Sequence, residues 1–113
     1  MNKEQSEALE ASINKWKGNV KAAKKNPLEV AISISSCPLC ILYYSADCEG
    51  CPILIKTGQV LCRDTPYHDV VKYRNIANAR IKYMHDPIER EERTAAVVTT
   101  CEAEVKFLES LRE

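Results

Sequence analysis

Six cysteines carry most of the reactive chemistry in this sequence, and five of them lie between residues 37 and 62. Cys37 and Cys40 form one C-x-x-C pair, Cys48 and Cys51 form a second, and seven residues separate the two pairs. Two such pairs can bind opposite sides of a tetrahedral metal ion through thiolate sulfurs at about 2.3 Å, and four thiolates leave no position open for a substrate. We therefore expect these four cysteines to hold a structural metal ion, with zinc as the expected metal.

A fifth cysteine complicates this assignment. Cys62 follows Cys51 after ten intervening residues. A mononuclear tetrahedral site takes four ligands, so either one of the five cysteines is spare or Cys62 replaces one of the earlier four. Cys40 lies in an apolar run and is the first candidate for replacement. The candidate metal ligands are therefore Cys37, Cys40, Cys48, Cys51 and Cys62.

Two other kinds of chemistry use similar cysteine spacings. Four thiolates also hold iron–sulfur clusters, and Cys51-Pro52 is similar to the cysteine-proline ending of some ferredoxin motifs. The second alternative is a redox-active pair at Cys37 and Cys40, but a thioredoxin-like C-x-x-C needs a βαβ context that this sequence lacks. An iron–sulfur cluster therefore stays open as an alternative cofactor, and redox catalysis is disfavoured.

The remaining potential ligands have more ordinary interpretations. His68 and His85 lie at the edges of expected helices beside polar or charged neighbours, where exposed histidines are common. Cys101 falls on the apolar side of the last expected helix, where a thiol packs as a small hydrophobic side chain. The phosphate-binding, dinucleotide-binding, metalloprotease and hydrolase-nucleophile motifs are all missing from the sequence. We therefore expect a protein that is not an enzyme.

Composition limits the partners and the compartment. The 113 residues contain 16 basic and 16 acidic side chains, so no net charge draws the protein to nucleic acid or to an anionic membrane. The longest uncharged stretch, residues 30–46, is too short to span a bilayer, and the charged N-terminus does not resemble a secretory signal. We expect a cytoplasmic protein, where six cysteines favour metal binding over disulfides.

The first half of the chain contains one clear helical pattern. Leu9, Ile13, Trp16, Val20 and Ala23 recur every three or four residues and predict an amphipathic helix over residues 4–25, which Asn26-Pro27 ends. Alternating apolar residues over 28–34 predict a short extended segment, with a helix as the alternative. Ser35-Ser36-Cys37-Pro38 predicts a serine-capped short helix over 39–44 that carries Cys40, and residues 47–62 are expected to be irregular.

Two further helices are expected in the second half. Thr65-Pro66 and Asp86-Pro87 each provide a capping residue followed by proline, which predicts helices over 66–84 and 87–112. The apolar side of the last helix is expected at Ala95, Val98, Cys101, Val105, Leu108 and Leu111, with charged residues including Glu104 outside. The prediction is a single domain over residues 1–113, mostly α, with three to four helices and an irregular cysteine-rich metal-binding region.

Taken together, these segments resemble an uncharacterised family of short cysteine-rich proteins from bacteriophages and bacterial prophages. The matching pieces extend over nearly the whole chain: Ile13-Asn-Lys-Trp16, Cys37-Pro-Leu-Cys40, Cys48-Glu-Gly-Cys51-Pro52, Thr57-Gly58, Cys62-Arg-Asp-Thr65-Pro66-Tyr67 and Phe107-Leu-Glu-Ser-Leu111. The family pattern includes all five cysteines up to Cys62, which implies a role for the fifth, but it has glycine where this chain has Asp64. The resemblance implies a viral or prophage setting, hence the host-cell cytoplasm, and no particular activity.

Three functional hypotheses follow. The first is a non-catalytic, zinc-stabilised protein that binds a larger host or viral protein through exposed side chains such as Tyr67 and Leu61. The second is a zinc-dependent nucleic-acid-binding regulator, since six lysines against three glutamates precede Pro27, although the neutral overall charge disfavours it. The third is an iron–sulfur redox or sensor protein. The heptad-like stripe of the last helix also makes a homodimer an open possibility.

Overall fold

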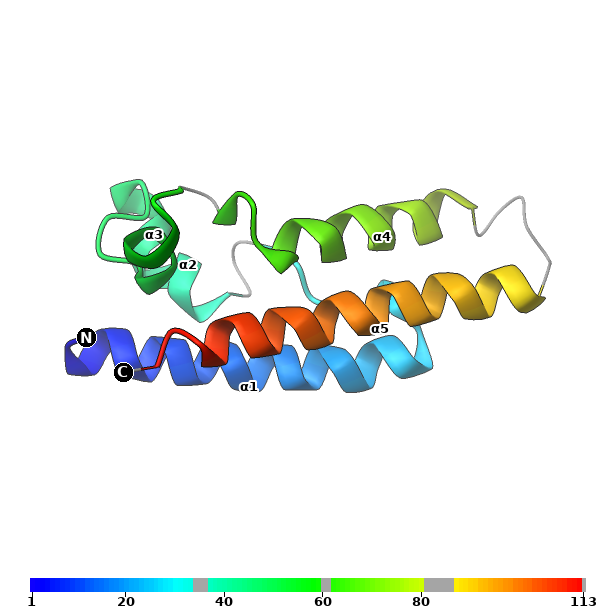
Figure 1. Ribbon diagram of the computed structural model, residues 1–113, viewed down its shortest axis with the longest axis horizontal. Helices are drawn as coiled ribbons and strands as arrows, with labels where there is room; N and C mark the ends of the chain where they lie inside the picture. The colour runs from blue at the N-terminus through cyan, green and yellow to red at the C-terminus, as the bar shows by residue number, and fades with distance from the viewer. Residues whose placement is uncertain (34–36, 60–61, 81–86, 113) are drawn as a thin grey trace.

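The computed structural model describes residues 1–33, 37–59, 62–80 and 87–112. Three long helices, α1 (Lys3–Lys25), α4 (Pro66–Arg80) and α5 (Pro87–Glu109), lie lengthwise in a body of 48 × 22 × 20 Å (Figure 1). No strand occurs in these ranges, so the mostly α fold class is confirmed. Among the described residues, no helix is long and apolar enough to cross a membrane.

Helix α1 follows its sequence signals closely. The Asn2 side chain accepts a 2.8 Å hydrogen bond from the Gln5 backbone N–H, and the Gln5 side chain accepts one of 2.9 Å from the Asn2 N–H. This reciprocal capping box fixes the start of the helix. Asn26 ends it in extended backbone, and Pro27 begins a short 3-10 turn, η1 (Pro27–Glu29). The predicted apolar face is buried at Leu9, Ile13, Trp16 and Ala23.

The segment after α1 is held by side chains from α1 itself and from α4. Part of the expected extended run over 28–34 forms η1, and Val30 then adopts extended backbone, while residue 34 lies outside the described residues. The buried Asn19 side chain makes two 3.1 Å hydrogen bonds to the backbone of Ala31, one as donor and one as acceptor. The Tyr67 hydroxyl donates a 2.8 Å hydrogen bond to the carbonyl of Ile32. These contacts fix Ala31 and Ile32 against α1 and α4.

The cysteine-rich region contains more helix than expected. The short helix α2 (Pro38–Tyr43) was predicted, but its N-cap residue is Cys37, which makes no capping hydrogen bond, so the expected serine cap is wrong. A 3-10 turn η3 (Tyr44–Ala46) follows, and a second six-residue helix, α3 (Pro52–Thr57), occupies part of the region expected to be irregular. The sequence does contain signals for α3, because proline at its first position and Gly58 as a left-handed C-cap mark its two ends.

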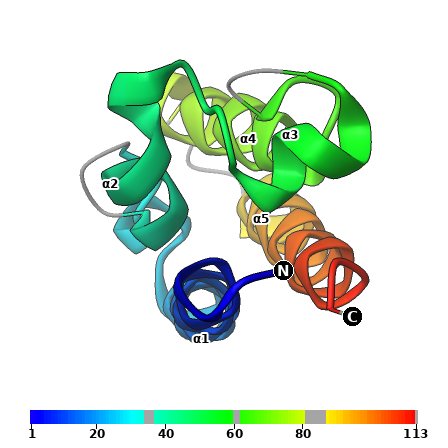
Figure 2. The same cartoon turned by 90° about the vertical axis from the view of Figure 1, so that its left-hand side faces the viewer.

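The long helices and the cysteine-rich region share one core. Helix α5 runs antiparallel to both α1 and α4, and α4 covers only one half of the α1–α5 pair (Figure 1). Helices α2 and α3 lie over the other half, close to both chain ends, as Figure 2 shows from that end. Leu39 from α2 and Ile53 from α3 are 1% and 3% exposed, so both short helices are anchored in the core by an apolar side chain.

The buried face of α5 differs from the apolar pattern. It includes Val97, Cys101 and Leu108 and also Glu104, which is 2% exposed, so the expectation that Glu104 faces outward is wrong. A count of apolar spacings cannot identify a buried carboxylate, since it treats every charged residue as solvent-facing. Cys101 and Leu108 are buried within the chain, so the stripe considered for a homodimer is used for intrachain packing.

Candidate metal centre

Three separate segments bring the five candidate cysteines to one end of the molecule. Cys37 and Cys40 come from the start of α2, Cys48 and Cys51 from the turn before α3, and Cys62 from the turn before α4. Their convergence depends on contacts with the long helices, because α2 and α3 are too short to be stable alone. One such contact is the 2.7 Å hydrogen bond from the Gln5 side-chain amide on α1 to the carbonyl of Gly50.

Four of these cysteines surround a small cavity. Cys40, Cys48, Cys51 and Cys62 line a space of about 20 Å³, together with apolar side chains that include Leu39. A volume of this size accommodates a single water-sized atom. Tyr43, Tyr44 and Gln59 also line this space, but thiolates are the preferred ligands of zinc among these groups, so the four cysteines are the candidate donors for one ion.

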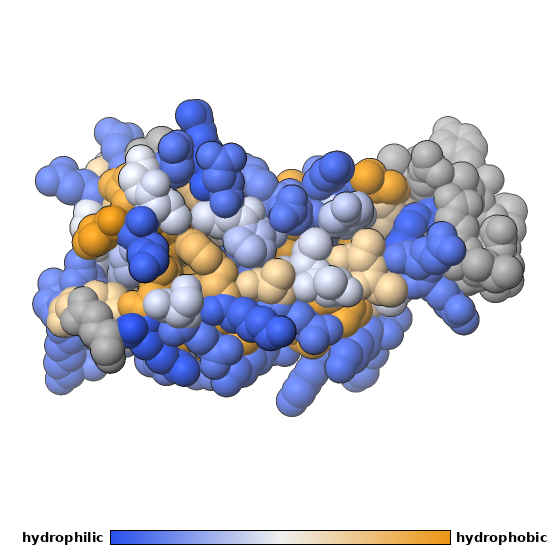
Figure 3. All heavy atoms as spheres, viewed as in Figure 1, coloured by the Kyte–Doolittle hydropathy of each residue, from blue (hydrophilic) through white to orange (hydrophobic). Residues whose placement is uncertain are grey.

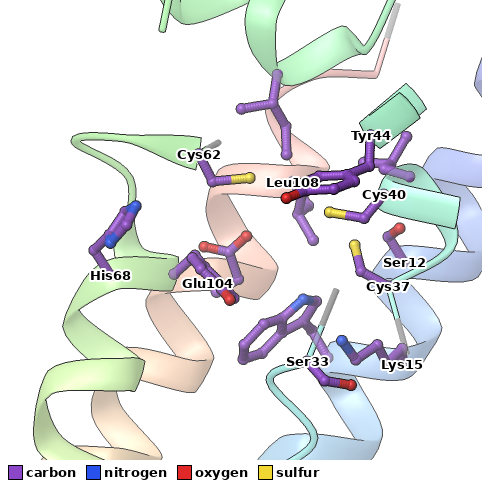
Figure 4. Close-up of a pocket in the computed structure, with 14 residues that line it drawn as sticks. Ser12, Lys15, Ser33, Cys37, Cys40, Tyr44, Cys62, His68, Glu104 and Leu108 are labelled. Carbon is purple, nitrogen blue, oxygen red and sulfur yellow. The ribbon is translucent and has the colours of Figure 1, made fainter. Parts of the chain in front are cut away.

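A larger cavity adjoins the first and shares two of its cysteines. It has a volume of about 210 Å³, and its sulfur donors are Cys37, Cys40 and Cys62. Figure 4 shows Cys37 and Cys40 on one side of this cavity and Cys62 and Glu104 on the opposite side. The remaining wall is mainly apolar, with Lys15 as the basic side chain at its edge, and includes Trp16, Leu39, Ile53, Tyr67 and Leu108. Cys40 and Cys62 therefore form the boundary between the two cavities.

The cysteines differ in acidity because their surroundings differ. A hydrogen bond from the Cys40 thiol lowers the pKa of Cys37, and nearby Lys15 lowers it further, while the same hydrogen bond raises the pKa of Cys40. Burial raises the pKa of Cys51, and burial next to Cys37 raises the pKa of Cys62 to about 12. Most of these thiols are therefore protonated at neutral pH, and a metal ion would have to displace their protons.

Glu104 contributes a carboxylate to the larger cavity. Its pKa is raised to about 7, chiefly by burial and also by the proximity of Cys37. The backbone N–H of Tyr67, in the first turn of α4, donates a hydrogen bond to this carboxylate and partly offsets that shift. Its second oxygen, Oε2, is buried and accepts no hydrogen bond from any described residue. An acceptor left in this state costs free energy unless something binds it.

Lys15 is the counterpart of Glu104 across the cavity. Its Nζ atom is buried, makes no hydrogen bond to a described residue, and lies 5.1 Å from the centroid of the Trp16 ring. Burial lowers the pKa of Lys15, and the negative charges of Cys37 and Glu104 oppose that shift. The amine is thus placed to offset negative charge that develops on the thiols.

The backbone around the cysteines is held in an unfavourable conformation at several points. Asp47, Cys48, Cys62 and Asp64 all have positive φ angles, between 53° and 66°. For residues other than glycine, the left-handed region costs about 1–2 kcal/mol each, with less for aspartate. Because two of the four residues are candidate ligands, an interaction that fixes the cysteines would offset part of this cost.

Sequence reasoning found the cysteines and missed their neighbours. The five candidate cysteines line two adjoining cavities, and Cys101 lies in the core, 0% exposed, as expected. His68 is exposed at the edge of the larger cavity, whereas His85 and Leu61 lie outside the described residues. Tyr67, expected as a partner contact, is half-buried with its ring edge-on to Trp16 at 6.2 Å between centroids.

The side chains are not yet in a coordinating arrangement. Within the described ranges, no three histidine, cysteine, aspartate or glutamate side chains are grouped closely enough to hold a metal ion as they stand. Cys37 and Cys40 instead hydrogen-bond to each other. Cysteine thiols reach new positions by rotation about a single side-chain bond, so metal binding would require side-chain rotation and the loss of that hydrogen bond.

Comparisons with known proteins provide no relative for this chain. No protein-family model matches the sequence, and neither the curated proteins nor the solved structures contain a match. The interpretation of the site therefore depends on its own residues.

Proposed function

We propose that this chain is a non-catalytic, metal-stabilised interaction protein, in which one structural zinc ion fixes the α2–α3 end so that it can bind a larger protein. The observation that carries the proposal is the small cavity lined by Cys40, Cys48, Cys51 and Cys62. Four thiolates make a closed zinc site without a position for substrate. The ligand set thus keeps Cys40 and omits Cys37, the reverse of what the apolar run around Cys40 suggested.

The energetics of the region support a structural role for the metal. Helices α2 and α3 have six residues each, and two candidate ligands adopt positive φ angles. A structural zinc ion can contribute roughly 10 kcal/mol or more of folding free energy, which exceeds these local costs. Zinc would therefore fix a segment whose own helices contribute little stability.

The surface of this end supports a protein partner. Four large apolar side chains are exposed there, Ile41 at 65%, Leu42 at 41%, Tyr44 at 46% and Ile55 at 68%. All four belong to α2, η3 or α3, the elements that the metal would hold in place. Figure 3 shows hydrophobic atoms at this end among hydrophilic neighbours. A contiguous exposed apolar surface is typical of interaction sites, and we propose that these side chains form one here. A host or viral partner is the expectation that follows from the sequence resemblance, and the binding experiment below tests it.

Metal removal tests the structural part of the proposal. We expect a strong chelator under reducing conditions to lower the thermal midpoint of the protein and to make its thiols reactive toward a thiol reagent. Cys51→Ser should reproduce this effect, because it removes one proposed ligand. Cys101→Ala is the matched control, since its thiol is buried in the core away from both cavities, and it should keep its response to chelation. An unchanged midpoint and unchanged thiol reactivity after chelation would refute a structural ion.

A binding experiment tests the interaction part. Immobilised protein with bound zinc should retain a specific protein from a host lysate, and the variant Ile41→Ser/Ile55→Ser should lose it, because two exposed apolar contacts are removed. Ala11→Ser, exposed on α1, is the control and should retain the partner. Equal retention by both variants would refute the α2–α3 surface as the interaction site. Retention of nucleic acid with a strong salt dependence would instead favour the nucleic-acid-binding alternative.

A further inference from the structure

The larger cavity is built like a binding site for a small organic molecule. It has a volume of about 210 Å³, and its wall is mainly apolar and includes the rings of Trp16 and Tyr67. An apolar cavity of about 150 Å³ binds benzene, so by proportion this cavity holds roughly eight or nine ring atoms. A few polar groups set in a mainly apolar wall are typical of sites for small ligands.

Three polar atoms in this wall have no hydrogen-bond partner among the described residues. They are Glu104 Oε2, Ser12 Oγ and Lys15 Nζ. Glu104 and Ser12 are 2% and 0% exposed. Figure 4 shows Glu104 on one side of the cavity and Ser12 and Lys15 on the opposite side. Since buried polar atoms are nearly always hydrogen-bonded, these atoms indicate that a polar group binds in the space between them.

Glu104 determines which kind of polar group fits. One of its oxygens accepts a hydrogen bond from the Tyr67 backbone N–H, which holds the carboxylate at the start of α4. The other oxygen, when the carboxylate is ionised, can only accept, so the ligand must offer an N–H or O–H group. Lys15 and Glu104 already supply charges of both signs, and a mainly apolar wall disfavours burial of a further charge. A neutral ligand is therefore favoured.

The cavity reaches the surface, so a ligand can enter without unfolding of the protein. Three of its lining residues, Ser33, Tyr44 and His68, are exposed. Trp16 and Leu108, which also line it, are 2% and 1% exposed. A ligand that packs against these two side chains is removed from water, and burial of its apolar surface favours binding.

We propose that the larger cavity binds a small neutral aromatic molecule of one or two rings, oriented by an N–H or O–H group that donates to Glu104 Oε2. The aromatic class follows from the rings of Trp16, Tyr44 and Tyr67 in the wall, because aromatic rings gain attraction from packing against one another. The inference goes beyond the proposed structural metal site and is independent of it, since Glu104 and these rings are not among the proposed metal ligands.

Indole and benzofuran are suitable probes, because they share one shape and differ in one ring position, which is an N–H in indole and an oxygen in benzofuran. We expect calorimetric titration of the reduced protein, as purified and in mildly alkaline buffer, to give saturable binding of indole. Its affinity should exceed that of benzofuran by about tenfold or more, as expected for a hydrogen bond to a charged acceptor. The side-chain N–H resonance of Trp16, the only tryptophan in the chain, should shift during the titration.

Glu104→Gln tests the role of the carboxylate. The amide oxygen can still accept from the Tyr67 N–H, and the amide nitrogen then presents a donor to the cavity. The preference for indole over benzofuran should therefore be lost. Glu102→Gln makes the same change at an exposed position of α5 and should keep the preference. Circular dichroism should show the helix content of the unaltered protein in both variants.

Several results would overturn this inference. Neither probe binding saturably, or binding that leaves the Trp16 resonance in place, would exclude the cavity as an aromatic-ligand site. Equal affinities of indole and benzofuran for the unaltered protein would refute the hydrogen bond to Glu104, and this comparison stands even if Glu104→Gln fails to fold. A preference for indole that persists in folded Glu104→Gln would refute the same assignment.

Discussion

Replacement of Asn19 by alanine should destabilise the protein by an amount that can be worked out from its contacts. Asn19 is 5% exposed and makes two hydrogen bonds of 3.1 Å to Ala31. At about 1 kcal/mol each, their loss costs about 2 kcal/mol, and the better helix propensity of alanine returns about 0.5 kcal/mol. The net loss of about 1.5 kcal/mol should lower the thermal midpoint by roughly 7 °C for a domain of this size.

Asn14→Ala is the matched control for this experiment. Asn14 is exposed on the same helix, so this variant makes the same chemical change and gains the propensity term alone. Urea and thermal unfolding, followed by circular dichroism on metal-loaded protein, should place the two variants about 2 kcal/mol apart. Equal stability of Asn14→Ala and Asn19→Ala would refute the claim that Asn19 holds the segment leading to Cys37.

Three further predictions concern other parts of the structure. Asp64→Gly should stabilise the protein by about 0.5 kcal/mol in urea unfolding, because φ of 59° suits glycine, whose greater backbone entropy cost offsets part of the gain; a loss of stability would contradict this. Gly50→Ala should reduce stability and metal occupancy more than Gly58→Ala, since a Cβ at residue 50 would lie 3.2 Å from a tyrosine ring carbon, whereas the space at residue 58 is open. The Arg112 guanidinium lowers the pKa of Glu10 through hydrogen bonds of 2.7 and 2.8 Å. This pair therefore stabilises the fold above the unfolded pKa near 4.5, and the stabilisation is lost as pH falls through the lower folded pKa. Arg112→Ala should reduce this acid sensitivity of stability, and an unchanged dependence of stability on pH would contradict the assignment.

The long helices could be predicted from local sequence signals. Capping residues, proline at first helical positions and three-to-four-residue apolar spacing predicted all three long helices, and α4 and α5 begin at the expected prolines. Helix α3 was missed because six residues are too few to show periodicity, although Pro52 and Gly58 marked its ends. Local signals of this kind determine elements before any tertiary contact is considered.

Sequence signals predicted only part of the candidate site. The C-x-x-C spacing identified the cysteines, but their division between two cavities depends on how α2, α3 and the start of α4 pack, which no spacing reveals. Glu104 was assigned to the solvent-exposed face of its helix because charged residues usually lie there, and Lys15 was given no role. The sequence did contain a signal for Glu104. It lies three residues after Cys101 and four before Leu108, and this spacing puts it on the same helix face as these two buried residues.

The metal content of the purified, untagged protein tests the central claim most directly. Elemental analysis of aerobic and anaerobic preparations, with a visible absorption spectrum recorded alongside, should find one zinc ion per chain and no colour. Iron with sulfide-linked absorbance would contradict the zinc assignment in favour of an iron–sulfur cluster, and the absence of bound metal from both preparations would contradict a metal centre of any kind.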